Sequence, residues 1–383
     1  MDRIYLDYAA TAPVLPEVLD AMLPFFVNRY GNPSGIHGEG RDTRRALEQA
    51  RREVAQALGA ESSEICFTSG GSESDNLAIQ GTAFVLRGKG NHLITSRIEH
   101  PAVLNTCRWL EKQGFQITFL PVDEYGTVSP EAVREAIRPE TILVSIMTAN
   151  NEIGTLEPVA EIGAICRQKG VLFHTDAVQA VGMIPLRAGE MNADLISISA
   201  HKFHGPKGTG ALYIRRGTRL DALIHGGSQE RGLRAGTENV PGIVGMGKAI
   251  TIAAAETEKS AERIGKLRDE LVRLVRDRVP DTKVNGHPKE RLANNCHFSF
   301  AGVDSEALLL RLDLAGIAVS GGSACTAGST EPSHVLQAIG LEEELQKGSI
   351  RLTLGRETTP AEIKKTAQVL PEIVSDLRRM RNL

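Results

Sequence analysis

Seven short apolar segments alternate with helix-like segments between about residues 60 and 215. Most of the seven are apolar throughout, as strands are when both faces of a parallel sheet are covered. The intervening segments carry helix signals, such as Pro101 near the start of one and Gly114 near its end. We therefore predict an α/β domain in which helices flank a mostly parallel seven-stranded sheet. The strand candidates are EICFTSG, HLITS, QITFLPV, TILVSIMTA, VLFHTDA, DLISISA and GALYIR.

The rest of the chain predicts a second, smaller domain. A chain of 383 residues is too long for one ordinary core. A long, charged, amphipathic helix is expected from about residue 255 to 279, followed by the strand candidates NNCHFSF, GIAVSG and RLTL and a final helix from Pro360. We predict a large α/β domain over residues 12–255. Residues 1–11 and 256–383 would form a smaller α+β domain.

Charge and hydropathy exclude some classes of partner. The net charge is −3, which gives no basic face for nucleic acid. No apolar run is long enough to span a membrane. The first residues, MDRIYLDYAATAP, lack the basic-then-apolar layout of a signal peptide. We expect a cytoplasmic protein with no membrane partner and no direct nucleic-acid partner.

The cysteines are scattered, odd in number and never spaced C-x-x-C, which argues against a disulfide framework or a zinc ribbon. Cys325 differs from the others because it lies in VSGGSACTAGSTEPSH, where almost no side chain can pack. Such a segment, about residues 320–332, is expected to be mobile and able to carry a thiol between two places. A solitary loop cysteine is more often incidental, so this hypothesis depends on Lys202. The other four are expected to be small buried hydrophobes: Cys66, Cys107, Cys166 and Cys296.

Chemically capable residues stand at the ends of at least five predicted strands. Ligands of open α/β sheets bind beyond the carboxyl ends of the strands, so these residues are expected to form one pocket. The groups are 69–72 (SGGS), 99–100 (EH), 150–152 (NNE), Asp176 with Gln179, and 199–202 (SAHK).

Two of these groups suit a phosphorylated ring cofactor, and each has a plainer alternative. SGGSES, with a helix expected to begin near Ser74, resembles a phosphate cradle. A plain strand-to-helix turn is the commoner explanation, and the lack of Walker A and G-x-G-x-x-G patterns gives nucleotides little support. Asp176 could pair with a protonated ring nitrogen, with Gln179 near a phenolic oxygen, or could cap a helix.

Lys202 is the candidate for a Schiff base with an aldehyde cofactor, because a pocket containing cationic or imidazole groups disfavours its charged form. Ser199 and His201 could then donate hydrogen bonds to a phosphate. His100 could stack on the ring or shuttle protons; a loop histidine with ordinary partners is the alternative. A zinc site at His201 and His204 is the weakest hypothesis, since no third ligand is apparent.

With these residues identified, the chain resembles the cysteine desulfurases of the NifS/IscS type, a branch of the class V aminotransferase-like pyridoxal phosphate enzymes. The resemblance covers nearly the whole chain and implies the fold type I of pyridoxal phosphate-dependent transferases. The matching segments are YLDYAATAP, YGNPSGIHGEGR, FTSGGSESDNLAI, EHPAV, NNEIGTLEP, FHTDAVQAVG, SAHKFHGPKGTGALYIRR, GGSQERGLRAGTENV, SGGSACTAGSTEPSHVLQAIG and SIRLTLGR.

The resemblance implies a role for each matching residue. Lys202 would hold pyridoxal 5'-phosphate covalently and remove the α-proton of the substrate. Asp176 would face the pyridine nitrogen, Gln179 the phenolic oxygen, and His100 would stack on the ring and deprotonate a thiol. The phosphate would be bound by Gly71, Ser72, Ser199 and His201, and by Thr237 of the neighbouring subunit. The substrate carboxylate would be bound by Asn151 and Arg351, with Arg356 as the alternative to Arg351.

The implied reaction removes sulfur from L-cysteine, giving L-alanine and a persulfide on Cys325. The sulfur would pass to an acceptor, such as an iron–sulfur scaffold protein or a tRNA-thiolation enzyme, or serve the synthesis of another thio-cofactor. The enzyme would be a homodimer with no metal in its resting state, although Cys325 could transiently contact an iron–sulfur cluster. Transamination, cleavage of selenocysteine and a non-catalytic sulfur-relay subunit are the alternatives. Cys325 argues against the first, and the intact lysine motif argues against the last.

Overall fold

All seven predicted strands form one central sheet. The computed structural model describes residues 3–321 and 333–381. The strand order is β2-β8-β7-β6-β5-β3-β4. β8 runs antiparallel to both of its neighbours and every other pair is parallel, so the mostly parallel sheet is confirmed. The strands are β2 (Ile65–Thr68), β3 (His92–Ser96), β4 (Gln116–Leu120), β5 (Thr141–Ser145), β6 (Leu172–Asp176), β7 (Leu195–Ser199) and β8 (Gly210–Ile214).

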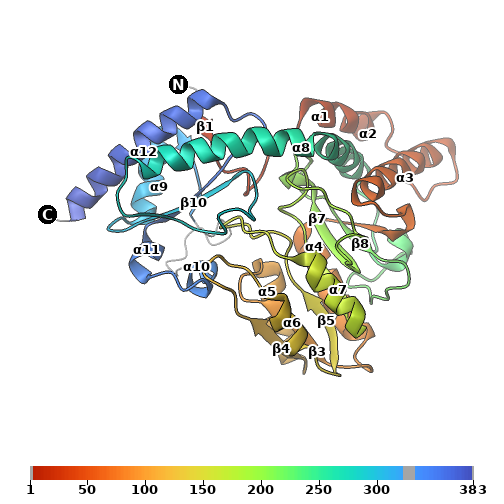
Figure 1. Cartoon of the computed structure of the whole chain (residues 1–383). Coiled ribbons are helices and arrows are strands. Elements are labelled where there is room, and N and C mark those ends of the chain that lie inside the picture. Colours follow the sequence, from red (N-terminus) through yellow and green to blue (C-terminus); the bar gives the residue numbers. More distant parts are fainter. Residues whose placement is uncertain (1–2, 322–332, 382–383) are drawn as a thin grey trace.

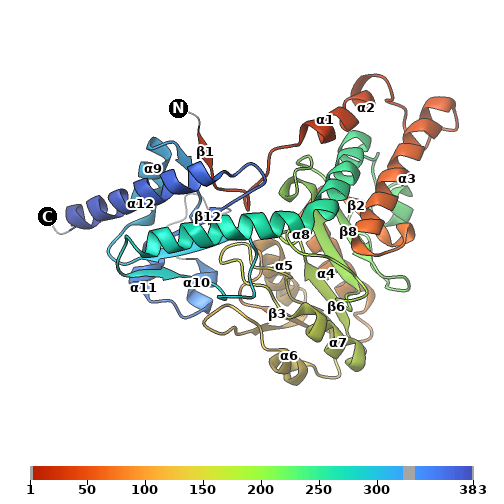
Figure 2. The same cartoon turned by 45° about the horizontal axis from the view of Figure 1, so that its top comes forward.

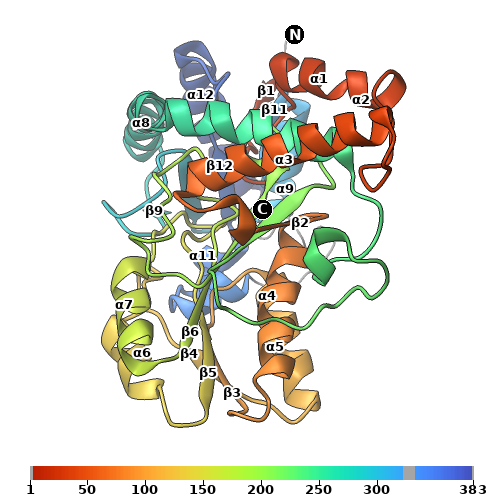
Figure 3. The same ribbon diagram turned by 90° about the vertical axis from the view of Figure 1, so that its right-hand side faces the viewer.

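Helices cover both faces of this sheet, with α4 and α5 on one side and α6 and α7 on the other (Figure 3). Successive side chains of a strand point to opposite faces, so one strand supplies two cores. On β5, Val144 packs into one buried cluster and Leu143 into the other. This double burial explains why the strands are apolar throughout. The helices of this part are α1 (Pro16–Met22), α2 (Pro24–Val27), α3 (Gly38–Leu58), α4 (Gly71–Val85), α5 (Pro101–Lys112), α6 (Pro130–Ala136) and α7 (Val159–Lys169).

A second core lies around a small antiparallel sheet of order β12-β10-β9. The N-terminal strand β1 pairs in parallel with β11, and Ile4 and Leu6 join this core. Figure 2 shows β1 beside α9 and α12, far along the chain. The elements are β1 (Ile4–Tyr5), β9 (Thr282–Val284), β10 (Asn295–Phe300), α9 (Ser305–Leu314), β11 (Ile317–Ala318), α10 (His334–Ala338), α11 (Glu343–Lys347), β12 (Ser349–Thr353) and α12 (Pro360–Arg381).

Helix α8 (Val240–Arg276) runs through both parts of the molecule (Figure 1). The predicted start at about residue 255 is where the charged face of this helix begins. The helix itself begins earlier, because its first half is rich in small apolar residues that pack on α3. A Cβ atom on Gly247 would lie 2.8 Å from Cα of Ala50. Its Met246 belongs to the large core and its Ile264 to the small one. The predicted boundary at 255/256 falls between them, and the two-domain division remains our proposal.

The four described cysteines are free and buried, as expected. Burial raises the pKa of Cys66, Cys166 and Cys296 to about 12, so these thiols stay protonated and unreactive. Cys325 lies outside the described residues. None of the described helices combines the length and apolar character needed to cross a membrane.

A buried ion pair fixes the loop after β8 to the edge of the central sheet. Nη1 of Arg51 lies 2.6 Å from Oε2 of Glu230, and Nη2 lies 2.7 Å from Oε1. Glu230 also accepts the backbone N–H of Phe67 on β2, at 2.9 Å. Both charged side chains are almost completely buried. The pair therefore holds the segment that leads to Thr237.

The substitution Glu230→Ala should destabilise the fold strongly, because it removes the only buried carboxylate that pairs with the Arg51 guanidinium among the described residues. We expect the free energy of unfolding in urea to fall by about 3–5 kcal/mol. Glu48→Ala is the matched control: Glu48 contacts the same arginine at 3.2 Å from a side chain that is 44% exposed. It should cost less than about 1 kcal/mol. Equal losses for the two variants would contradict this account.

Candidate active site

A cavity of about 310 Å³ lies at the carboxyl ends of the central strands. Ten of the predicted site residues line it, contributed by both parts of the chain. Nine of them belong to the groups expected at the strand ends, whereas Arg351 was expected only from the family resemblance. Ala9 and Ala10 of the N-terminal segment also line this cavity. The ten are Gly71, Ser72, His100, Asn151, Asp176, Gln179, Ser199, His201, Lys202 and Arg351.

Lys202 stands at the end of the single 3-10 turn that follows β7. Its Nζ donates hydrogen bonds to the carbonyl oxygens of Ala9, at 2.6 Å, and Ala10, at 2.9 Å. Nε2 of Gln179 donates to the same Ala9 carbonyl at 3.0 Å. Ala9 and Ala10, which sequence analysis assigned to the small domain and gave no role at the site, therefore position the candidate lysine.

Asp176 ends β6 and is buried, with its carboxyl group accepting the backbone N–H of Val178 at 2.9 Å. No helix begins here: the following residues form a turn, so the helix-capping alternative is not what the structure shows. Burial raises the pKa of Asp176, and His100, the Val178 N–H and Lys202 oppose that rise. The carboxylate thus has the stabilising partners that a buried charge needs.

The predicted phosphate cradle is the N-terminus of α4, which begins at Gly71 rather than near Ser74. Gly70 precedes it with φ of 155°, a conformation that favours glycine. A Cβ atom on Gly71 would lie only 2.7 Å from Cγ2 of Val178 and 3.6 Å from Cβ of Ser199. The close approach brings the positive end of the helix and its backbone N–H groups to the cavity, where an anion is favoured.

His201 faces this cavity, whereas His204 faces a different one. Nδ1 of His201 lies 3.2 Å from Oγ1 of Thr11, and burial together with two lysines lowers the pKa of His201 to about 4, so the ring is neutral. Nδ1 of His204 lies 2.9 Å from the Pro13 carbonyl oxygen. The two imidazoles do not converge on one point, which removes the basis of the zinc hypothesis.

His100 precedes α5 and its Nδ1 accepts the backbone N–H of Ala102 at 3.1 Å. A neutral imidazole that accepts at Nδ1 carries its proton on Nε2. In this arrangement His100 is a hydrogen-bond donor at Nε2. Removal of a proton from a thiol by this ring would first require the bond to Ala102 to be released.

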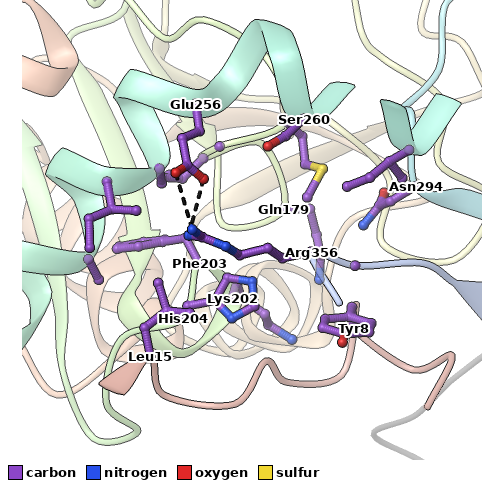
Figure 4. A pocket seen from close by; sticks show the side chains of 18 residues that line it. Tyr8, Leu15, Gln179, Lys202, Phe203, His204, Glu256, Ser260, Asn294 and Arg356 are labelled. Atoms are coloured by element: carbon purple, nitrogen blue, oxygen red, sulfur yellow. Dashed lines mark hydrogen bonds and ion pairs between the residues drawn. The ribbon is translucent and has the colours of Figure 1, made fainter. Parts of the chain in front are cut away.

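Of the two candidate arginines, only Arg351 lines the cavity. Its side chain is 1% exposed, pairs with Asp7 at 3.0 Å and donates to the Asn151 carbonyl oxygen at 2.8 Å. Arg356 pairs with Glu256 at 3.1 Å and lines a second cavity of about 50 Å³. Figure 4 shows Arg356 reaching Glu256 in that second cavity, with His204 and Lys202 below them in the view.

The remaining predicted residues lie elsewhere. Thr237 is exposed in the single chain and does not line the cavity. Cys325 lies outside the described residues, and the described chain continues at Ser333. There, Ser333 donates to Glu152 at 2.5 Å, and Nε2 of His334 lies 3.0 Å from the Glu99 carbonyl oxygen. These contacts hold the chain against Glu99, which precedes His100, and against Glu152, which follows Asn151.

Sequence analysis missed Asp75, which also lines the cavity. It stands four residues after Gly71, about one helical turn, and that spacing on a helix places it on the same face. Donor atoms of Asp75, His100 and Asp176 all lie within 4.8 Å of one another. Sequence analysis could have identified it by asking which residues lie one helical turn after the predicted phosphate cradle.

Comparisons with known proteins identify the family. The family model for aminotransferase class-V matches residues 4–366. A cysteine desulfurase IscS from Dictyoglomus turgidum is 56% identical over 376 residues, which are 98% of this chain and 95% of that protein. A solved NifS-like protein has a TM-score of 0.92 at 39% identity and covers 98% of this chain and 100% of that one. The structure of SspA in complex with cysteine has a TM-score of 0.82 at 40% identity and covers 92% and 98%. The chain belongs to the class-V aminotransferase family and, within it, to the cysteine desulfurases of the NifS/IscS type.

Proposed function

We propose that this enzyme uses pyridoxal 5'-phosphate to remove sulfur from L-cysteine, giving L-alanine and a persulfide on Cys325. The observation that carries the proposal is that Lys202, Asp176 and the N-terminus of α4 face one cavity. A lysine amine, a buried carboxylate and an anion cradle match the aldehyde, the ring nitrogen and the phosphate of that cofactor.

The residues present fit the cofactor. Gly71 and Ser72 begin α4, Ser199 is buried next to them, and His201 is a neutral ring at the same cavity, so hydrogen-bond donors are available for a phosphate. Asp176 would pair with the ring nitrogen. Gln179 would face the phenolic oxygen, and His100 would lie against the ring.

Bound pyridoxal phosphate supplies an aldehyde that condenses with amines and a ring that accepts electrons from the bond to be broken. The chain supplies the rest. Lys202, positioned by the carbonyls of Ala9 and Ala10, would hold and move the proton at Cα of L-cysteine. Asp176 would keep its negative charge at the ring nitrogen. His100 would donate through Nε2 in the arrangement described above.

Arg351 would bind the substrate carboxylate, together with Asn151. Its Nε is buried and has no hydrogen-bond partner among the described residues, so a substrate carboxylate that reached it would satisfy this donor. Asp7 neutralises the guanidinium at 3.0 Å, and a bound carboxylate would compete with Asp7 for it. The arginine charge would therefore be paired with a carboxylate both in the empty cavity and when the substrate is bound.

Cys325 would take the sulfur. Its thiolate attacks the thiol sulfur of the substrate, the carbon–sulfur bond breaks with its electrons left on the substrate carbon, and that carbon is reprotonated to give alanine. The proposal includes transfer of the persulfide sulfur to an acceptor protein, such as an iron–sulfur scaffold or a tRNA-thiolation enzyme. A cytoplasmic location is part of it, and the four free, buried cysteines are consistent with a reducing compartment.

A homodimer completes the proposal. Large apolar side chains gather on α1, α2 and the segment after them, where Phe26 is 58% and Ile36 is 91% exposed. An exposed apolar patch of this kind suits contact with a second copy of the chain. Thr237, exposed on one protomer, would then reach the phosphate site of the other.

The variant Cys325→Ser should bind pyridoxal phosphate normally but release no alanine above background from L-cysteine, because a hydroxyl cannot accept the sulfur. Alanine is measured after incubation of cofactor-loaded protein. Cys166→Ala is the matched control, since this buried cysteine lies on α7 and not at the cavity. It should release alanine at close to the wild-type rate. Equal alanine release by Cys325→Ser and the wild type would refute the proposed sulfur transfer.

Arg351→Lys should raise the KM for L-cysteine about tenfold or more, because a lysine replaces a guanidinium that binds carboxylates through two N–H groups. Steady-state alanine release gives KM and kcat. Arg356→Lys is the control and should change KM less than about twofold, because Arg356 pairs with Glu256 at the second cavity and a lysine keeps that charge. The reverse ranking would make Arg356 the substrate-binding arginine.

A further inference from the structure

Asp75 is a buried acid for which the proposed reaction has no assigned role. It lies on α4 and lines the cavity, and it is 1% exposed. The nearby Ser197 hydroxyl on β7 lowers the pKa of Asp75 and so opposes the effect of burial. Its Oδ1 has no hydrogen-bond partner among the described residues. A buried carboxylate oxygen without a partner carries a large desolvation cost, which protonation removes.

The histidine that lies against Asp75 from β6 does not supply a positive charge. His174 on β6 lies 3.7 Å away, but burial lowers the pKa of His174 to about 3 and the ring is neutral. Its two nitrogens are used by Ser145, at 2.8 Å, and Ser197, at 2.9 Å. No lysine or arginine among the described residues forms an ion pair with Asp75.

The other facing groups are His100, Asp176 and, further off, Glu99. Burial raises the pKa of Glu99 to about 8, so this carboxyl group is mostly neutral at pH 7. Asp176 is the charged competitor, with a carboxyl oxygen within 4.8 Å of one from Asp75. Two carboxylates this close in a buried site do not both ionise.

The two carboxyl groups differ in their partners. Asp176 accepts the Val178 N–H and is near Lys202 and His100, which favour its ionised form. Asp75 shares His100 with Asp176 but has no lysine or arginine partner of its own among the described residues. Burial followed by the charge of Asp176 raises the pKa of Asp75 well above its ordinary value, and Ser197 opposes that rise. The negative charge therefore belongs on Asp176 and the proton on Asp75.

We propose that Asp75 and Asp176 form a pair of carboxyl groups that shares one proton, held mainly by Asp75. Asp75 is a positioning residue: it keeps a single negative charge at Asp176, where that charge faces the ring nitrogen of the cofactor. The part of this inference that concerns the ring rests on the proposed function. The protonation of Asp75 does not, and it is tested separately.

The first experiment detects the proton on Asp75 in the cofactor-free protein. An infrared difference spectrum between the wild type and Asp75→Asn at pH 7 should contain the band of a protonated carboxyl group, shifted in D₂O. Glu73→Gln, on the same helix, is the control: its acid pairs with Arg234 at 3.0 Å, so only a carboxylate band should disappear. If Asp75→Asn removes a carboxylate band instead, the proposal is wrong.

A stability measurement gives a second test without cofactor. Unfolding returns Asp75 to its ordinary pKa, so the folded state holds a proton that the unfolded state loses as pH rises. The free energy of unfolding of the wild type should therefore fall relative to Asp75→Asn between about pH 5 and pH 8. A difference between the two proteins that does not change with pH would overturn the proposal.

The third experiment measures the dissociation constant of pyridoxal phosphate at pH 7. Asp75→Asn keeps a neutral donor and should bind within about threefold of the wild type, whereas Asp75→Ala removes the donor and should bind about tenfold more weakly. Glu157→Gln, another buried acid whose pKa burial raises but which does not line the cavity, should leave the constant unchanged. If Asp75→Asn weakened cofactor binding as much as Asp75→Ala, the proposal that Asp75 is neutral would be wrong. If neither the wild type nor any variant bound pyridoxal phosphate, that result would count against the proposed function alone.

Discussion

The cost of burying charge governs how the site is built. Lys202, Asp176 and Arg351 all face one cavity at the junction of the two cores, where water cannot solvate them fully. Each has a specific partner: backbone carbonyls for Lys202, a backbone N–H for Asp176 and the Asp7 carboxylate for Arg351. Without these partners the desolvation cost would neutralise the groups or unfold the site.

Much of this compensation comes from the N-terminal segment. Ile4 and Leu6 are packed in the small core, and Ala9 and Ala10 accept hydrogen bonds from the lysine that follows β7. Asp7 stands between Leu6 and Ala9 in the sequence, and its carboxylate pairs with Arg351 of β12. One short segment therefore connects the small sheet, the candidate lysine and the candidate substrate arginine. Any relative movement of the two cores would change these three contacts together.

The sequence predicted the sheet well because a strand buried on both faces must be apolar, and that pattern is local. It also placed Asp176 and Lys202 at one pocket, because Asp176 ends one such strand and Lys202 follows another closely. It did not predict the roles of Ala9 and Ala10, because a carbonyl oxygen belongs to every residue and leaves no side-chain signature. It missed Asp75 because a buried acid on α4 looks in sequence like a solvated one. The early start of α8 was missed because its buried half has no polar face.

The protonation states follow from the same geometry and limit the chemistry. His100 carries its proton on Nε2, His201 is neutral, and Asp75 holds the proton that Asp176 lacks. Among these four groups, only Asp176 is a ready proton acceptor, and the proposed function uses its charge at the ring nitrogen. Under that proposal, a proton released from the substrate would go to Lys202, to water or to a rearranged His100. This makes the carbonyl contacts of Lys202 central, because they decide where its amine can reach when it takes that proton.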